Sequence, residues 1–186
     1  NSIVTSVSIP SSVKKINNYL FYNCSELTSV SISSGVTIIG DSAFEGCSGL
    51  TSVSIPNSVT SIGVSAFEGC SGLISVSIPS SVTRIRDYTF LDCSGLTSVS
   101  ISNGVTSIGY KAFNGCGGLT SVSIPNSVTS IDYEAFSYCS KLKDVYYLGT
   151  ALQWAQVDGG DMDSAAIHCS DGICAGKGYC GASYYD

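Results

Sequence analysis

The stretch Leu50–Gly72, LTSVSIPNSVTSIGVSAFEGCSG, recurs with small changes along most of this chain. The repeating units begin at a constant step of 23 residues, at Val4, Leu27, Leu50, Leu73, Leu96 and Leu119. Six cysteines follow the same step: Cys24, Cys47, Cys70, Cys93, Cys116 and Cys139. A fixed period of this length predicts a repeat solenoid, in which each unit forms one coil that packs only on its neighbours.

The first half of each unit carries a strand signal. Val53 and Ile55 lie two residues apart, so they share one face of a strand, and we expect Ser52 and Ser54 on the outer face. Pro56 has no N–H to give to a neighbouring strand, so it ends the ladder of hydrogen bonds. Strands from successive units are therefore predicted to stack in parallel.

The second half of each unit predicts a shorter extended segment and then a turn. Residues 59–62 provide the extended segment. Ala66, Phe67 and Cys70 have the spacing i, i+1, i+4, which predicts a short helical or 3₁₀ turn with one apolar face.

Two glycines mark the place where this turn ends and the next strand begins. We expect a left-handed backbone at Gly69 and at Gly72, because glycine adopts it without a steric penalty. The position of Gly69 holds glycine, asparagine or aspartate in most other units, and these residues tolerate this conformation. Tyr138 occupies it in the last unit and fits it poorly.

The pattern resembles the BspA-type leucine-rich repeat. The motif L-x-x-V-x-I-P-x-S-V-x-x-I-G-x-x-A-F-x-x-C-x-x-L stands nearly intact in residues 50–73, and the resemblance extends over residues 4–142. It implies a right-handed leucine-rich-repeat solenoid with short parallel strands on both sides. It also implies a surface or secreted protein of bacteria or protists, since several members of this family are adhesins.

The domain organisation follows from where the repeat stops. We expect a solenoid over residues 1–168, made of repeats 4–141 and a C-terminal cap 142–168, followed by a Gly/Cys-rich tail, 169–186. A terminal coil needs a cap over its open edge, and we interpret Trp154, the only tryptophan, as a plug on the last coil. Residues 165–168 are predicted to form a last short strand. Because the repeat is already under way at Asn1, we interpret the chain as a fragment of a longer protein.

The cysteines divide into two groups. We expect the six repeat cysteines to be structural: free thiols that face the interior and donate weakly to turn carbonyls. The tail cysteines, Cys169, Cys174 and Cys180, could form one disulfide or bind zinc together with His168. Their spacing departs from that of zinc knuckles, so no metal is predicted.

Other chemical motifs are weak. Asp158, Asp161 and Asp163 form an acidic loop without the later glutamate of a calcium site. His168 is the only histidine, and no nucleophile elbow is present, so we expect neither an enzyme nor a cofactor. The sequence Asn23-Cys24-Ser25 is formally a glycosylation sequon, which we discount because Cys24 is expected to be buried.

Two surfaces remain for binding. One is an array of outward serines, namely Ser29, Ser31, Ser52, Ser54, Ser75, Ser77, Ser98, Ser100, Ser121 and Ser123. The other is the position before Ala-Phe, where the units differ. Here we predict a binding ledge formed by Tyr88, Tyr110 and Tyr133, with Lys111 and Glu134 beside it, because tyrosine is favoured at interfaces.

Charge and hydropathy exclude several partners. The net charge is −6 and 12% of residues are charged, so a basic groove for nucleic acid is not expected. No apolar run approaches the ~18 residues of a membrane span, so membrane insertion is not expected either. We predict a monomeric, non-enzymatic module at the cell surface or outside the cell, which binds a protein or glycan of a host or neighbouring cell. The alternative is a structural spacer; an ice-binding surface and a hydrolase are remote.

Overall fold

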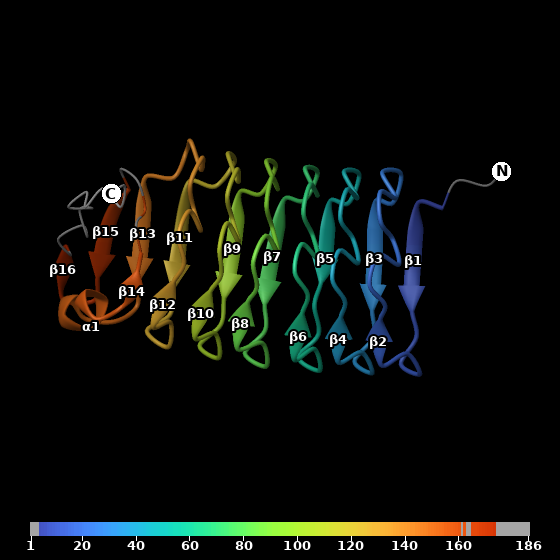
Figure 1. Ribbon diagram of the computed structural model, residues 1–186, viewed down its shortest axis with the longest axis horizontal. Helices are drawn as coiled ribbons and strands as arrows, with labels where there is room; N and C mark the ends of the chain where they lie inside the picture. The colour runs from blue at the N-terminus through green and yellow to red at the C-terminus, as the bar shows by residue number, and fades with distance from the viewer. Residues whose placement is uncertain (1–3, 161, 163–164, 174–186) are drawn as a thin grey trace, which may run out of the picture.

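The computed structural model describes residues 4–160, 162 and 165–173, which form a parallel β-solenoid of about seven turns. Figure 1 shows the coils stacked along one axis, with β1 at one end of the rod and β15, β16 and α1 at the other. Each coil contributes one longer strand to one face and one two-residue strand to the other. This arrangement confirms the predicted solenoid.

The longer strands form one continuous sheet. Its order is β1-β3-β5-β7-β9-β11-β13-β15-β16, and every pair except the last is parallel. Residues one repeat apart face each other, as Val30 and Val53 do. The bounds are β1 (Ser6–Ile9), β3 (Ser29–Ile32), β5 (Ser52–Ser54), β7 (Ser75–Ile78), β9 (Ser98–Ile101), β11 (Ser121–Ile124), β13 (Asp144–Tyr147), β15 (Ala166–Cys169) and β16 (Gly172–Ile173).

The short strands form two separate sheets, β2-β4-β6 and β14-β12-β10-β8. Side-chain hydrogen bonds join some of the consecutive coils just after their short strands. Asp41 Oδ1 accepts from the amide of Val64 at 2.9 Å, and Asp87 Oδ1 accepts from the amide of Tyr110 at 3.2 Å. The bounds are β2 (Lys15–Ile16), β4 (Ile38–Ile39), β6 (Ser61–Ile62), β8 (Arg84–Ile85), β10 (Ser107–Ile108), β12 (Ser130–Ile131) and β14 (Asp158–Gly159).

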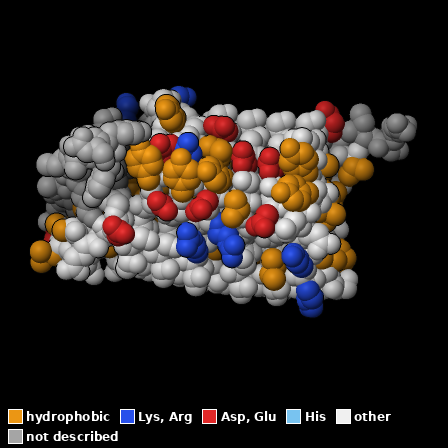
Figure 2. Space-filling model, viewed as in Figure 1, with side chains coloured by type: hydrophobic (Ala, Val, Ile, Leu, Met, Phe, Trp, Pro, Cys, Tyr) orange, Lys and Arg blue, Asp and Glu red, His pale blue; other side chains and the backbone are white. Residues whose placement is uncertain are grey.

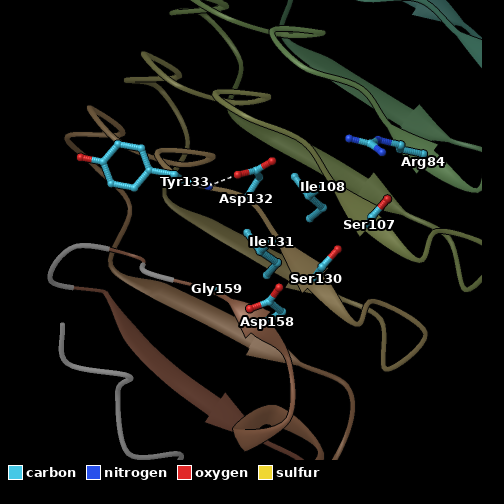
Figure 3. Close-up of a pocket in the computed structure, with 9 residues that line it drawn as sticks. All are labelled: Arg84, Ser107, Ile108, Ser130, Ile131, Asp132, Tyr133, Asp158 and Gly159. Carbon is cyan, nitrogen blue, oxygen red and sulfur yellow. Dashed lines mark hydrogen bonds between the residues drawn. The ribbon is translucent and has the colours of Figure 1, made fainter. Parts of the chain in front are cut away.

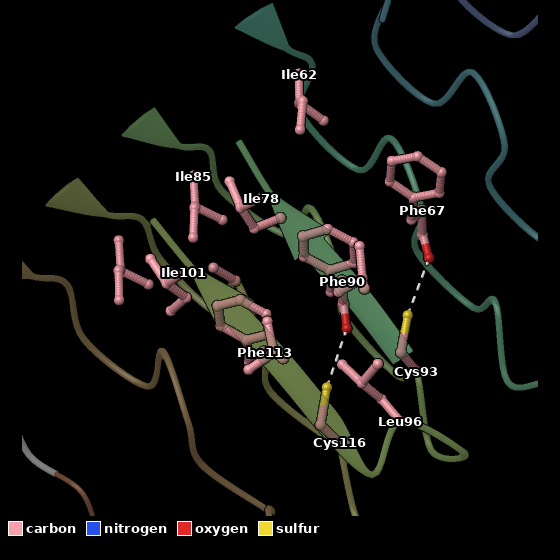
Figure 4. Close-up of a cluster of buried hydrophobic side chains, with 14 of the residues drawn as sticks. Ile62, Phe67, Ile78, Ile85, Phe90, Cys93, Leu96, Ile101, Phe113 and Cys116 are labelled. Atoms are coloured by element: carbon pink, nitrogen blue, oxygen red, sulfur yellow. Dashed lines mark hydrogen bonds between the residues drawn. The ribbon is translucent and has the colours of Figure 1, made fainter. Parts of the chain in front are cut away.

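The core is a column of identical side chains in register. Phenylalanines of successive coils stack with ring centroids 5.1–5.4 Å apart: Phe21, Phe44, Phe67, Phe90, Phe113 and Phe136. Beside this column, the thiol of Cys93 donates to the carbonyl of Phe67 at 3.2 Å, and Cys116 repeats the bond to Phe90 at 3.4 Å (Figure 4). The thiols thus donate to turn carbonyls, as predicted, and from Cys47 to Cys139 each such bond ties a coil to the preceding one.

The turn after each short strand is not the helical turn that the sequence analysis predicted. Ser65 and Gly69 have φ values of +55° and +68°, and two left-handed residues within one turn interrupt any helix. The backbone N–H groups of this turn donate alternately to the next coil and to their own coil. Phe67 N–H donates to the carbonyl of Thr89 in the next coil at 2.9 Å, and Glu68 N–H donates to the carbonyl of Ser65 at 3.1 Å.

Of the two glycines predicted to be left-handed, one is and one is not. Gly69 has a positive φ, and so does Tyr138, at +59°, despite its side chain. Gly72 does not belong to this group. A Cβ there would lie 2.5 Å from the carbonyl oxygen of Ser48, so close approach of the preceding coil explains this glycine.

The cap closes the last coil with residues outside the repeat. Helix α1 (Ala151–Ala155) begins with a capping box, in which Thr150 and Gln153 each accept a backbone N–H from the other. Trp154 is 1% exposed and packs on Tyr147 with ring centroids 5.2 Å apart. The predicted burial of Trp154 and a strand near residues 165–168, observed as β15, are both confirmed.

Candidate functional site

The tyrosines before Ala-Phe form a contiguous strip. We call Tyr88, Tyr110 and Tyr133 the tyrosine strip. Tyr110 and Tyr133 occupy the same position in consecutive coils, and their rings stack at 6.4 Å with an angle of 10° between planes. Tyr88 lies one place later in its coil, in the left-handed position with φ +59°, so its ring meets Tyr110 edge-on at 5.3 Å.

Exposure increases along the strip toward the cap. Tyr133 is 57% exposed, whereas Tyr88 and Tyr110 are half-buried. The ammonium of Lys111 lies 5.2 Å from the centre of the Tyr110 ring and 3.1 Å from a carboxylate oxygen of Glu134. Hydrogen bonds to Glu134 and then to Tyr110 raise the pKa of Lys111 above its ordinary value, so the amine stays charged. The five predicted binding residues thus lie together.

Figure 2 shows this side of the rod as a surface. Hydrophobic side chains gather in a band over the middle coils, with acidic side chains on both sides of it. Most of the basic side chains on this face lie below the band in this view. An apolar band with polar rims has the layout of a protein–ligand contact surface.

A shallow groove of about 250 Å³ adjoins the strip at its exposed end. Its floor is Ser107 and Ser130 from β10 and β12, and Arg84 and Asp158 stand at its two ends (Figure 3). Asp132 forms one side, and Ile108, Ile131, Tyr133 and Gly159 complete the lining. The ring of Tyr133 points away from the groove, beyond Asp132 (Figure 3).

Sequence reasoning missed this groove. Arg84 could have been noticed, because it replaces the serine that Ser61, Ser107 and Ser130 supply at the same repeat position. Asp158 could not, because it follows the repeats, and only the pairing of β14 with β12 brings it beside Ser130.

The strand face carries exposed serines in two regular rows, as predicted, until the last coil. There Asp144 and Tyr146 take the serine positions on β13, and His168 on β15 faces Tyr146. His168 Nε2 lies 2.8 Å from Asp144 Oδ1, and its ring stacks on Tyr146 at 4.9 Å. Within the described residues, no serine hydroxyl bonds to His168.

The predicted cysteine column holds for five of its six members. Cys47, Cys70, Cys93, Cys116 and Cys139 are buried, and the first four are free thiols. Burial raises the pKa of the Cys47 thiol to about 11 and that of Cys93 to about 12. Burial also raises the pKa of Cys70, and the pKa of Cys116 is raised by its side-chain hydrogen bond with Cys139 and then by burial. These thiols are unreactive near neutral pH.

Cys24 corrects the prediction that every repeat cysteine is buried. Among the described residues Cys24 is exposed, whereas Cys47, one repeat later, donates to the carbonyl of Phe21. The sequon Asn23-Cys24-Ser25 was discounted because Cys24 was expected to be buried. All three residues are exposed, so that argument no longer holds. Cys169 is disulfide-bonded, which removes its thiolate as a zinc ligand.

Part of the predicted tail chemistry lies outside the described residues, namely Asp161, Asp163, Cys174 and Cys180. Within the described part of the chain, no group of three His, Cys, Asp or Glu side chains could hold a metal ion. No helix there is long and apolar enough to cross a bilayer.

Comparison with known proteins agrees with this geometry, which defines a leucine-rich-repeat solenoid. The BspA type leucine-rich repeat region matches in six copies, over residues 1–93 and 66–151. The chain therefore belongs to the BspA-type leucine-rich repeat family. None of the curated proteins compared with it matches significantly.

Several solved bacterial structures are similar. A leucine-rich repeat protein from Bacteroides ovatus has 35% identity and a TM-score of 0.73, over 77% of this chain and 39% of that protein. One from Eubacterium ventriosum has 29% identity and a TM-score of 0.71, over 88% and 41%. The leucine-rich repeat protein of T. pallidum has 25% identity and a TM-score of 0.56, over 89% and 69%. The chain thus spans about two fifths of the length of the first two.

Proposed function

We propose that this chain is a non-enzymatic binding module, displayed outside the cell or on its surface, that recognises a protein or glycan of a host or neighbouring cell. The observation that carries the proposal is the tyrosine strip. Its rings contact one another, edge-on at Tyr88 and stacked between Tyr110 and Tyr133, and the ring nearest the cap is 57% exposed.

The repeat does not require these rings. The position of Tyr110 and Tyr133 holds Asn18, Asp41 and Val64 in earlier coils, which fold in the same way. Stacked tyrosines are rigid and amphipathic, so they bury a large area on a partner at a small entropic cost. Membership of the BspA-type family supports an extracellular location for such a surface.

The histidine geometry supports a module without catalysis. Asp144 orients His168, but the ring faces Tyr146 in place of a nucleophile. General-base catalysis needs a reacting group within hydrogen-bond reach of the base. A Ser–His–Asp device in the described residues is therefore not supported.

A spacer is the second candidate. It is favoured by the regularity of the rod, whose strand face repeats the same exposed serines from β3 to β11. A spacer needs stiffness and no ligand. It would bind nothing in the experiment below.

The test is a binding array of extracellular host proteins and glycans probed with this chain. Once a ligand is found, Tyr110→Ala with Tyr133→Ala is expected to weaken binding by at least ~2 kcal/mol, as hot-spot truncations do. The matched control, Ser75→Ala with Ser98→Ala, removes two exposed hydroxyls from the strand face and is expected to change binding little. The opposite pattern, with both variants folded, would place the site on the strand face.

A further inference from the structure

The groove between Arg84 and Asp158 is the place where departures from the repeat converge. Arg84 and Asp158 replace serine in one row of the short-strand sheet, which runs Arg84, Ser107, Ser130, Asp158. Asp132 replaces the glycine that Gly63 and Gly109 supply one residue after the short strand. Packing of the coils explains none of these three side chains.

The shape of the groove follows from the residues between those ends. Two serines give a floor two coils wide, and coils stack at about 4.7–4.9 Å, so the ends are about 14–15 Å apart along the backbone. At the cap end, Gly159 has φ +76°, and the carbonyl of Ile131 occupies the space that a Cβ would need. The cap therefore approaches closely and leaves only the carboxylate of Asp158 as the end wall.

The polar groups of the groove have unused hydrogen-bonding capacity. Asp132 Oδ1 accepts from the amide of Tyr133 at 2.7 Å, which leaves Oδ2 for another donor. No cation of the described residues lies within ion-pair distance of Asp132 or Asp158. Arg84 is 3.7 Å from Asp87 and exposed, so some of its N–H donors remain available. The serine hydroxyls can both donate and accept.

This chemistry matches a polyhydroxylated ring. Carboxylates accept strong, charge-assisted hydrogen bonds from sugar hydroxyls, and arginine and serine supply donors at the other end and on the floor. The groove has charges of both signs and no deep apolar slot for a side-chain anchor of a protein partner. The next sugar of a chain would leave the groove past Asp132, where the exposed ring of Tyr133 provides a stacking surface.

We propose that the groove formed by Arg84, Ser107, Ser130, Asp132 and Asp158 binds one neutral pyranose residue of an oligosaccharide that extends onto the tyrosine strip. This assignment rests on the proposed binding function and names the ligand class. Asp132 and Asp158 accept hydrogen bonds from the sugar hydroxyls. Ser107 and Ser130 form the floor under the ring, and Arg84 donates from the far end.

The experiment titrates this chain with neutral disaccharides built from glucose, galactose, mannose and N-acetylglucosamine, followed by amide chemical shifts. We expect at least one disaccharide to shift the amides of β10, β12 and β14. Asp132→Asn with Asp158→Asn keeps the shape and is expected to weaken binding at least about tenfold, because two charge-assisted hydrogen bonds become weaker neutral ones. Ser107→Leu with Ser130→Leu fills the floor and is expected to abolish binding.

Ser61→Leu is the matched control, because it changes the same strand position outside the groove lining. It is expected to leave sugar affinity within about twofold. Unchanged melting temperatures verify that the variants fold. Binding that survives Ser107→Leu with Ser130→Leu would overturn the assignment. The assignment would also be overturned if no neutral disaccharide bound to the chain, or if the chain bound oligolysine and no sugar.

The two proposals fail in different ways. A protein ligand that is lost with Tyr110→Ala and Tyr133→Ala but insensitive to the groove variants would overturn the sugar site and leave the binding module intact. A chain that binds no protein and no glycan would overturn both.

Discussion

The first described coil and the interior coils contain the same repeat, yet they differ in what they bury. Cys24 is exposed, whereas Cys47, one repeat later, is fully buried and donates to the carbonyl of Phe21 at 3.1 Å. Leu20 is 53% exposed, while Ala43 at the same position is fully buried. Burial in a solenoid is thus supplied by the neighbouring coil and not by the residue type.

The opposite end solves the same problem with residues outside the repeat. Tyr147, Trp154, Val157 and Met162 are all buried over the last coil. The amide of Ala151 donates to Asp171 Oδ1 at 2.8 Å, which ties α1 to the turn between β15 and β16. Within the described residues, the last coil is covered by a cap, whereas Leu20 and Cys24 of the first coil are exposed. This difference can be tested.

The largest expected effect comes from opening the capped end. Trp154→Ala is expected to lower the free energy of unfolding by ~3–5 kcal/mol, because it empties a site that is 1% exposed. Leu152→Ala on the same helix is the control, since that side chain is 78% exposed and its loss should cost less than ~0.5 kcal/mol. Chemical denaturation measures both, and an unchanged midpoint for Trp154→Ala would show that the cap does not seal the core.

An intermediate effect is expected from alkaline pH. The pKa of Cys93 is raised from 9.0 to about 12, so above pH 9 the thiol ionises in the unfolded chain but not in the folded one. The unfolded state then binds fewer protons, and stability falls as pH rises from about 9 toward 12, approaching ~1.4 kcal/mol per pH unit for each such thiol.

Denaturation under reducing conditions between pH 8 and 10.5 measures this slope. Cys93→Ala removes one buried thiol and should make the slope shallower. Val82→Ala truncates a fully buried side chain in the same coil without removing a thiol, so it should keep the slope of the unmodified chain. Equal slopes in both variants would contradict the assignment to buried thiols.

The smallest change in stability is expected at the exposed cysteine. Cys24 should react with a thiol reagent in the native protein, and its modification should alter the free energy of unfolding by less than ~0.5 kcal/mol. Cys47, Cys70, Cys93 and Cys116 should react only after denaturation. Mass spectrometry of labelled peptides distinguishes the sites, and native labelling of the interior four would show that the coils open readily.

Much of the fold could be predicted from the sequence, because a repeat supplies many copies of one observation. The strand at Val53, the second short strand and the left-handed Gly69 were predicted correctly, although β5 ends at Ser54, one residue before Ile55. The helical turn was wrong, since apolar spacing alone cannot reveal a left-handed residue such as Ser65.

The candidate site was only partly predictable. The register of the repeat placed Tyr110 beside Tyr133, because a residue one period later lies directly on the next coil. The groove depends on Asp158, whose position relative to Ser130 is set by how the cap folds back onto β12. A segment without the period carries no register that could be read in advance.

The sequence by itself determined the period, the inward and outward faces and the parallel stacking, because these are local properties repeated at every coil. Tertiary structure alone decided which copies are buried, where the short-strand sheet breaks and which side chains from the repeats and the cap share a groove. The physical reason is that burial and long-range hydrogen bonding depend on a neighbour. Cys24 and Cys47 occupy the same position in the repeat, yet Cys24 is exposed and Cys47 is buried against the described coil before it.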